Sequence, residues 1–178
     1  MASLLTTLAA AALLGWAIAL YNLLVRDRNR VAAAWSDIDV QLKRRHDLVP
    51  KLVDAVRAYA GYEQATLERV TALRQQGARL GEVAARGRVE GELGGQLHRL
   101  LVLAEAYPEL KADRAFLDLQ RNLSHVEEQI QYARRFYNGA VRNLNTRIDQ
   151  FPDLLLARLF GYRHAVYFEL DDPAERAP

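Results

Sequence analysis

The chain has 178 residues, of which 51% are hydrophobic and 26% are charged. This balance is typical of a globular protein and excludes a disordered chain, and the length fits one domain with an appendage. Cysteine is absent, which excludes a disulfide scaffold, a thiolate metal site and a cysteine nucleophile. The 24 basic and 22 acidic residues nearly cancel, so the charge does not predict a nucleic-acid-binding protein.

An uncharged run covers residues 4–25 at the start of the chain. As a helix this run would be about 33 Å long, which is enough to cross the hydrocarbon core of a bilayer. A cleaved signal peptide is the alternative, because Ala17-Ile18-Ala19 matches a small-x-small cleavage pattern. However, no basic residue precedes the run, and the run is long for a signal peptide. The sequence therefore favours an uncleaved, single-pass transmembrane anchor over residues 1–25.

Three arginines follow the uncharged run directly, namely Arg26, Arg28 and Arg30. Because the cytoplasmic flanks of membrane spans are enriched in basic residues, this asymmetry places the rest of the chain in the cytoplasm. We expect the three side chains to lie at the membrane surface, among the lipid headgroups.

Residues 26–150 are predicted to form an up-and-down bundle of about four long helices. The clearest helix covers residues 111–149, where apolar residues recur in alternating steps of three and four from Phe116 to Leu144. Such a heptad seam needs partner helices to bury it. A second seam runs from Val31 to Leu73 with hardly any change of phase.

The passage of the second seam across Pro50 leaves two interpretations open. One is a single long helix that kinks at Pro50. The other is two helices, the second of which is capped by Asp47 and holds Pro50 in its first turn. The first obvious loop is predicted at residues 76–81, and a weaker helix that contains several glycines is predicted at residues 83–106.

After the bundle, Phe151-Pro152 opens a short apolar helix that Gly161 ends. The side chains of residues 162–170 alternate in polarity, as they do in an extended strand or arm. Residues 171–178 are predicted to be a disordered tail. The segment 151–170 carries more apolar surface than a chain segment exposed to water normally has. We therefore predict that it mediates self-association or membrane contact, rather than closing the core, through five residues: Leu155, Leu159, Phe160, Val166 and Phe168.

Five polar residues within the helical patterns are candidates for setting the register of the bundle: Asn22, Asn29, Glu63, Asn138 and Asn145. The asparagines are candidates for hydrogen bonds between the first and last helices, since Asn is slightly disfavoured inside a helix. Glu63 lies on the second seam, where it either pairs with Arg134 or Arg135 in the core or faces water.

The basic run Lys43-Arg44-Arg45 also has two interpretations. It is either a solvated helix face, which the neighbouring acidic residues favour, or a contact for anionic lipids or an acidic partner.

No arrangement typical of an enzyme site occurs in the sequence. None of the four histidines is three or four residues from another, so no helix presents a paired imidazole site. The nearest metal-like pair, His125 and Glu128, lacks the further glutamates of a di-iron bundle. No nucleophile elbow, P-loop or dinucleotide fingerprint occurs. We therefore expect no enzymatic activity, no metal and no cofactor.

Several motifs together resemble the LemA family. They are Tyr21-Asn22-x-Leu24-Val25, the block from Ala34 to Val56, Tyr107-Pro108-Glu109-Leu110-Lys111-Ala112, Ala133-Arg134-Arg135-x-Tyr137-Asn138 and the ending Leu159 to Leu170. The resemblance covers nearly the whole chain from about residue 21, and it implies a small bacterial membrane protein with one N-terminal transmembrane helix and a bundle of about four helices. It also favours two helices at Pro50.

The resemblance to the LemA family brings no established biochemical activity. Members of the family often occur beside membrane metalloproteases of the HtpX type, and one relative takes part in magnetosome formation. Members commonly have His-Glu where this chain has Tyr62-Glu63, so a role for that histidine does not carry over.

The sequence thus predicts a non-enzymatic scaffold or interaction module at the bacterial inner membrane. Its expected partners are the lipid bilayer and other proteins, including a second copy of the chain, and no nucleic acid. The alternative function is that of an accessory or regulatory partner of an HtpX-type metalloprotease.

Overall fold

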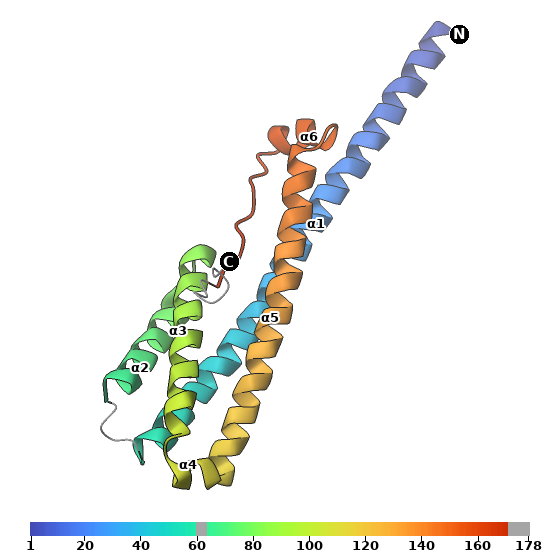
Figure 1. The fold of residues 1–178 in the computed structure, drawn as a ribbon. Helices are drawn as coiled ribbons and strands as arrows, with labels where there is room; N and C mark the ends of the chain where they lie inside the picture. The colour runs from blue at the N-terminus through green and yellow to red at the C-terminus, as the bar shows by residue number, and fades with distance from the viewer. Residues whose placement is uncertain (60–63, 171–178) are drawn as a thin grey trace, which may run out of the picture. The chain divides into compact units, whose positions relative to one another are not determined.

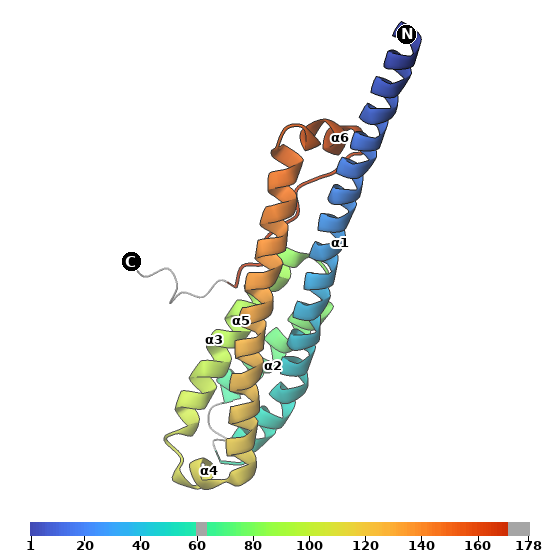
Figure 2. The same cartoon turned by 90° about the vertical axis from the view of Figure 1, so that its right-hand side faces the viewer.

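The computed structural model describes residues 1–59 and 64–170, and within them it has six helices and no strand (Figures 1 and 2). The predicted all-α fold is therefore confirmed. The helices are α1 (Ala2–Arg57), α2 (Gln64–Arg79), α3 (Val83–Ala104), α4 (Pro108–Ala112), α5 (Arg114–Asp149) and α6 (Asp153–Leu159).

The chain divides into two compact units. Among the described residues, unit 1 consists of 1–35 and 136–166, and unit 2 consists of 36–59, 64–135 and 167–170. The helices α1 and α5 each contribute residues to both units. Within unit 2, α2 and α3 lie side by side as antiparallel neighbours (Figures 1 and 2), as expected for an up-and-down bundle.

The N-terminal part of α1 is long and apolar enough to cross a membrane, and only 6% of its most apolar 18-residue window is buried. Leu4, Leu8 and Leu13 are among its exposed side chains. The predicted N-terminal candidate span is therefore present. Whether the segment is retained or cleaved stays a prediction.

The helix α1 continues through Pro50 to Arg57. Of the two interpretations of this passage, the single long helix is therefore the one observed, and the two helices that the family resemblance favoured are wrong. A proline inside a helix costs about 3 kcal/mol. Here its neighbours Val49 and Leu52 are buried while Pro50 itself is exposed. The burial of the seam on both sides of Pro50 therefore favours an unbroken helix, because each fully buried aliphatic side chain contributes about 1.5–3 kcal/mol.

The first helix boundary falls after Arg57, where no loop was predicted, and the loop predicted for residues 76–81 is confined to residues 80–82. Residues up to Arg79 belong to α2, and the connection to α3 is short. Gly77 is buried inside α2. The sequence signal was misleading, because this glycine serves close packing within a helix and not a turn.

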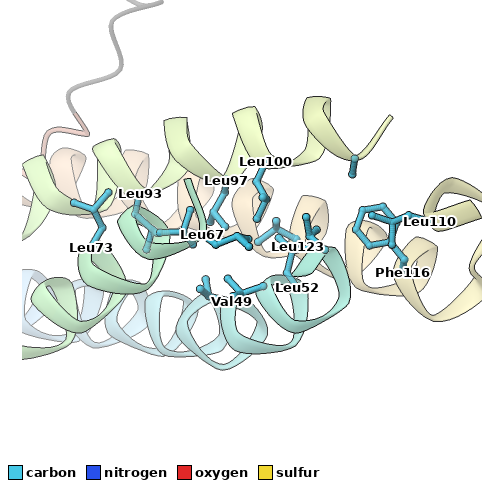
Figure 3. Packing of buried hydrophobic residues seen from close by; sticks show 14 of the residues in the cluster. Val49, Leu52, Leu67, Leu73, Leu93, Leu97, Leu100, Leu110, Phe116 and Leu123 are labelled. Atoms are coloured by element: carbon cyan, nitrogen blue, oxygen red, sulfur yellow. The ribbon is translucent and has the colours of Figure 1, made fainter. Parts of the chain in front are cut away.

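The core of unit 2 is built mainly from leucine and valine (Figure 3). Leu52, Leu67, Leu97 and Leu123 come from four different helices and meet in this cluster. The Asp113 side chain accepts hydrogen bonds from the backbone N–H groups of Ala115 (2.7 Å) and Phe116 (3.4 Å), and so caps the start of α5. This cap positions Phe116 at the edge of the same cluster.

Unit 1 has a smaller core, in which Leu24 of α1 packs with Leu144 and Ile148 of α5 and with Ala157 of α6. The helix α6 ends at Leu159, and Gly161, which follows the C-cap residue Phe160, has φ +68°. The Tyr162 N–H bonds to the Ala157 carbonyl at 2.9 Å, as in a glycine-terminated helix. Residues 162–170 follow as an arm without regular secondary structure.

The heptad seam of α5 is confirmed, because its alternating positions are buried or half-buried throughout. Its fully buried members are Phe116, Leu123, Val126, Ile130, Tyr137 and Leu144.

Candidate functional site

Unit 2 contains a buried ionic cluster of four side chains: Arg45 and His46 of α1, Glu90 of α3 and Glu127 of α5. Arg45 is 1% exposed and Glu90 is fully buried. Arg45 Nη1 donates to Glu127 Oε1 at 3.1 Å, and Nη2 donates to Glu90 Oε2 and to the Glu90 carbonyl. His46 Nε2 lies 2.8 Å from Glu90 Oε1.

The position of Arg45 follows from the helical seam. Ile38, Leu42, Val49 and Leu52 are buried on α1, and residue 45 completes their alternating steps of four and three. The basic run was therefore interpreted wrongly as one surface feature, since Lys43 and Arg44 are exposed while Arg45 is buried. The step of seven from Leu42 to Val49 was the signal that could have located it.

The charges of the cluster stabilise one another. Burial alone would lower the pKa of Arg45, but the nearby charges of Glu127 and Glu90 outweigh it, so that this pKa lies above its ordinary value. Burial alone would raise the pKa of Glu90, but the hydrogen bond from His46 and the charge of Arg45 hold it below its ordinary value. Both groups are therefore charged at neutral pH.

A missing side chain on α2 makes room for the cluster. A Cβ atom added at Gly77 would overlap Glu90 Oε1 and lie 3.4 Å from His46 Nε2. Arg74, one turn earlier on α2, donates from Nε to the His46 carbonyl at 3.0 Å. The helix α2 thus closes one side of the cluster.

A groove of about 580 Å³ opens beside the cluster, between α3 and α5. Its α3 wall carries Gly91, Gly94 and Gly95, and Arg45 also lines it. The Nε atom of Arg45 is buried without a hydrogen-bond partner. A Cβ atom added at Gly95 would meet nothing within 4 Å. The volume lies in the range of ligand-binding clefts, and the glycines allow close approach of another backbone.

Unit 1 holds a second ionic network around Arg147 of α5. Arg147 Nε donates to Asp27 Oδ2 of α1 at 2.6 Å, and Nη1 donates to Asp153 Oδ1 of α6 at 3.1 Å. Both carboxylates are buried, whereas the Arg147 side chain is 26% exposed. The hydrogen bond to Asp27 is the main cause that raises the pKa of Arg147. No signal in the sequence pointed to this network, because none of its members breaks an apolar seam.

The predicted membrane-proximal arginines Arg26, Arg28 and Arg30 are all exposed. Arg26 and Arg30 each lie 3.7 Å from Asp27 Oδ1, and the Arg28 guanidinium lies over the Tyr162 ring at 5.7 Å. Contact with headgroups stays a prediction, which the exposure of the three side chains permits.

The residues predicted to set the register lie in different environments in the structure. Asn22 and Asn29 are exposed, and a hydrogen bond from either of them to the last helix stays a prediction. Asn145 is half-buried, but its side chain bonds the arm instead of the first helix: Nδ2 donates to the Ala165 carbonyl at 3.0 Å, and Oδ1 accepts from the Ala165 N–H at 2.8 Å. Asn138 is half-buried and also has a partner.

The prediction for Glu63 lies outside the described residues. Its role in helix register therefore stays a prediction.

The predicted interaction arm has a buried end. Phe168 is fully buried, so its prediction as an interaction residue is wrong, and the arm takes part in closing the fold. A Cβ atom added at Gly87 of α3 would overlap the Glu169 carbonyl oxygen, so the glycine permits the arm backbone to pass. Tyr137 also donates from its hydroxyl to the Val166 carbonyl at 2.8 Å. The other four predicted residues, Leu155, Leu159, Phe160 and Val166, are exposed.

Among the described residues, no group of three or more His, Asp or Glu side chains is arranged to hold a metal ion. His125 is exposed and lies off the seam of α5.

The fold and these sites define a helical-bundle protein with one candidate N-terminal membrane span. A model of the LemA family matches residues 34–178. Protein LemA of Metamycoplasma hominis is 30% identical over 155 residues, which cover 85% of this chain and 69% of the relative. The chain therefore belongs to the LemA family, as its motifs predicted.

Magnetosome proteins are also similar to this chain. Magnetosome protein MamQ 2 of Paramagnetospirillum magneticum is 24% identical over 184 residues, and magnetosome protein MamQ of Magnetospirillum gryphiswaldense is 22% identical over the same length. Each alignment covers 89% of this chain and 67% of the relative.

Proposed function

We propose that the chain is a membrane-anchored, non-enzymatic interaction module of the inner membrane, whose bundle binds a partner protein in the cytoplasm. The observation that carries the proposal is the exposure of the apolar start of α1, where only 6% of an 18-residue apolar window is buried. A contiguous apolar surface of this size is not left in water by a soluble monomer. A bilayer is the environment that suits it.

The cytoplasmic location of the bundle is supported by the charges that follow the span. Arg26, Arg28 and Arg30 are exposed within the first turns after the uncharged run, and basic residues in such positions are retained on the cytoplasmic side.

The binding of a partner is supported by the groove beside the ionic cluster. The polar groups of Arg45, Glu90 and Glu127 are largely hydrogen-bonded to one another. This arrangement suits a structural role and not catalysis. The glycine wall at Gly94 and Gly95 offers a surface against which a segment of another protein can pack closely.

Membrane anchorage is tested by expressing the full chain and washing the membrane fraction with alkaline carbonate. We expect the protein to stay in the membrane with its N-terminal segment intact. A soluble product that begins after Ala19 would show that the segment is a signal peptide.

The groove is tested by placing the photoreactive residue benzoylphenylalanine at Gly95 in the full-length protein in living cells. The matched control is Val102, which is exposed on the same helix but does not line the groove. We expect a discrete crosslinked product at Gly95 that is absent at Val102. Equal products at both positions, or none at Gly95, would contradict a partner in the groove. Identification of the product also tests the HtpX-type protease alternative.

A further inference from the structure

The short helix α6 leaves part of its apolar surface exposed. Leu155 and Leu159, one turn apart, are 60% and 74% exposed, and Phe151 just before the helix is 73% exposed. On the opposite side, Asp153 and Ala157 are buried. A surface helix of a soluble protein normally buries its apolar stripe. The helix α6 buries Ala157 and packs the half-buried Leu156 against the core of unit 1, but it leaves Leu155 and Leu159 exposed.

Contacts within unit 1 hold α6 beside the end of the candidate membrane span. The rings of Tyr21 and Phe160 are 4.7 Å apart, and Leu24 packs in one cluster with Ala157. Tyr21 precedes the end of the uncharged run by four residues, or about 6 Å along the helix axis. This is the level at which the hydrocarbon of a bilayer gives way to headgroups.

Basic side chains surround the same level. Arg26 and Arg28 follow the span, and Arg158 and Arg163 come from α6 and the arm that follows it. All four are exposed. An apolar helix face with arginines at its margin has the composition of a segment that lies in the plane of an anionic membrane surface.

We propose that α6 is an interfacial membrane helix. Its outward face of Leu155 and Leu159 lies at the acyl boundary of the leaflet from which α1 emerges, and the neighbouring arginines contact anionic headgroups. This inference rests on the proposed anchorage of α1. It assigns a second attachment of the same molecule to the bilayer, which restricts how the soluble part can turn about its anchor.

The test uses the full-length protein in vesicles of phosphatidylcholine and phosphatidylglycerol. Because the chain has no cysteine, single substitutions allow labelling with the polarity-sensitive dye NBD. Leu159→Cys reports on α6, Leu13→Cys reports on the span, and Val102→Cys is an exposed control in unit 2. Lipids with a nitroxide near the headgroup or deep in the acyl chain quench the dye according to its depth.

We expect the dye at residue 159 to show blue-shifted emission and several-fold stronger quenching by the shallow nitroxide than the dye at residue 102. Adding Leu155→Asp should abolish both effects, and vesicles of phosphatidylcholine alone should weaken them. Both substituted leucines are exposed, so folding should be retained.

The outcomes separate the two proposals. If residue 13 is quenched deeply but residue 159 behaves like residue 102, the interfacial helix is wrong while the anchorage stands. If residue 13 is not quenched, the anchorage itself is wrong. If the signal at residue 159 disappears when the protein is diluted in lipid, a second copy of the chain covers α6 and the proposed lipid contact is overturned.

Discussion

Two arginines hold comparable positions in the two units of this molecule, and they differ in their access to water. In unit 2, Arg45 lies between Glu90 and Glu127 and is 1% exposed. In unit 1, Arg147 lies between Asp27 and Asp153 and its side chain is 26% exposed. Each arginine joins carboxylates from two other helices or helix segments.

The comparison shows that the same ion-pair chemistry has different consequences at different depths. Breaking a buried pair leaves an uncompensated charge, which costs about 3–5 kcal/mol. Breaking a pair in which one member is solvated costs less stability, because water and neighbouring charges replace the missing partner. Arg147 also shares Asp27 with two nearby arginines, Arg26 and Arg30. We therefore expect the bundle to depend on Arg45 far more than on Arg147.

The largest effect is expected for Arg45→Met, which keeps the length of the side chain and removes its charge. The free energy of unfolding should fall by about 3–5 kcal/mol, because Glu90 loses its main positive partner in the core. Chemical denaturation of the purified protein in detergent measures the loss. Arg44→Met is the matched control on the same helix, where the side chain is exposed, and it should change little.

The double substitution Arg45→Met with Glu90→Leu sharpens this test. Replacing both charges by apolar groups removes the unpaired carboxylate, and a large part of the stability should return. A double variant as unstable as Arg45→Met alone would contradict the assignment of the cost to Glu90.

The second effect is a loss of stability in acid. Because the pKa of Glu90 in the folded state lies below its ordinary value of 4.5, its contribution is present above pH 4.5 and is lost as the pH falls through the folded-state pKa. The loss should be smaller than that of Arg45→Met, because Arg45 keeps its pair with Glu127. Thermal melts from pH 7 to pH 3 should show a steeper decline for the wild type than for Glu90→Gln. Parallel declines would argue against a titrating Glu90.

The third effect compares two glycines inside helices. Gly77→Ala should destabilise the bundle by about 1–3 kcal/mol, because the new methyl group overlaps the Glu90 carboxylate. Gly139→Ala in unit 1 meets nothing within 4 Å, and it should stabilise its helix by up to about 1 kcal/mol. Shifts of the melting temperature in opposite directions would support the tight packing around the cluster. Equal shifts would contradict it.

The smallest effect is expected for Arg147→Gln, which removes a partly solvated charge. The free energy of unfolding should fall by roughly 1–2 kcal/mol, the size of a hydrogen-bonded pair that water can partly replace. Denaturation under the conditions used for Arg45→Met provides the measurement. A loss as large as that of Arg45→Met would mean that solvent access does not distinguish the two networks.

The elements with a periodic or uncharged sequence pattern could be predicted from the sequence. The seam of α5 and the exposed apolar start of α1 both follow from the spacing or absence of particular side chains, and the structure contains both. The spacing of the residues left the course of the chain at Pro50 open, and it misplaced the loop near Gly77. At both positions a residue that normally interrupts a helix is tolerated because of packing. Local preferences cannot reveal such cases, since the compensating contacts come from residues far away in the sequence.

The ionic cluster shows the same limit more sharply. Arg45 stands next to Lys43 and Arg44 in the sequence, and the three look alike, yet the helical phase buries only Arg45. The burial of Arg45 could be predicted from its position in the seam. The identity of its partner could not, because Glu90 lies 45 residues away on another helix. Pairing of this kind depends on which helices become neighbours.

The passage of the arm across Gly87 has a consequence for the order in which the molecule can be completed. Ribosomes add about 5–20 residues per second, so the 82 residues from Gly87 to Glu169 take about 4–16 s to synthesise. During that interval α3 exists without the segment that covers it, and Phe168 has not yet been made. The candidate span in α1, by contrast, leaves the ribosome first. Closure by the arm is therefore a late step in the completion of the fold, and under the proposed anchorage the span can enter the bilayer while the bundle is still open.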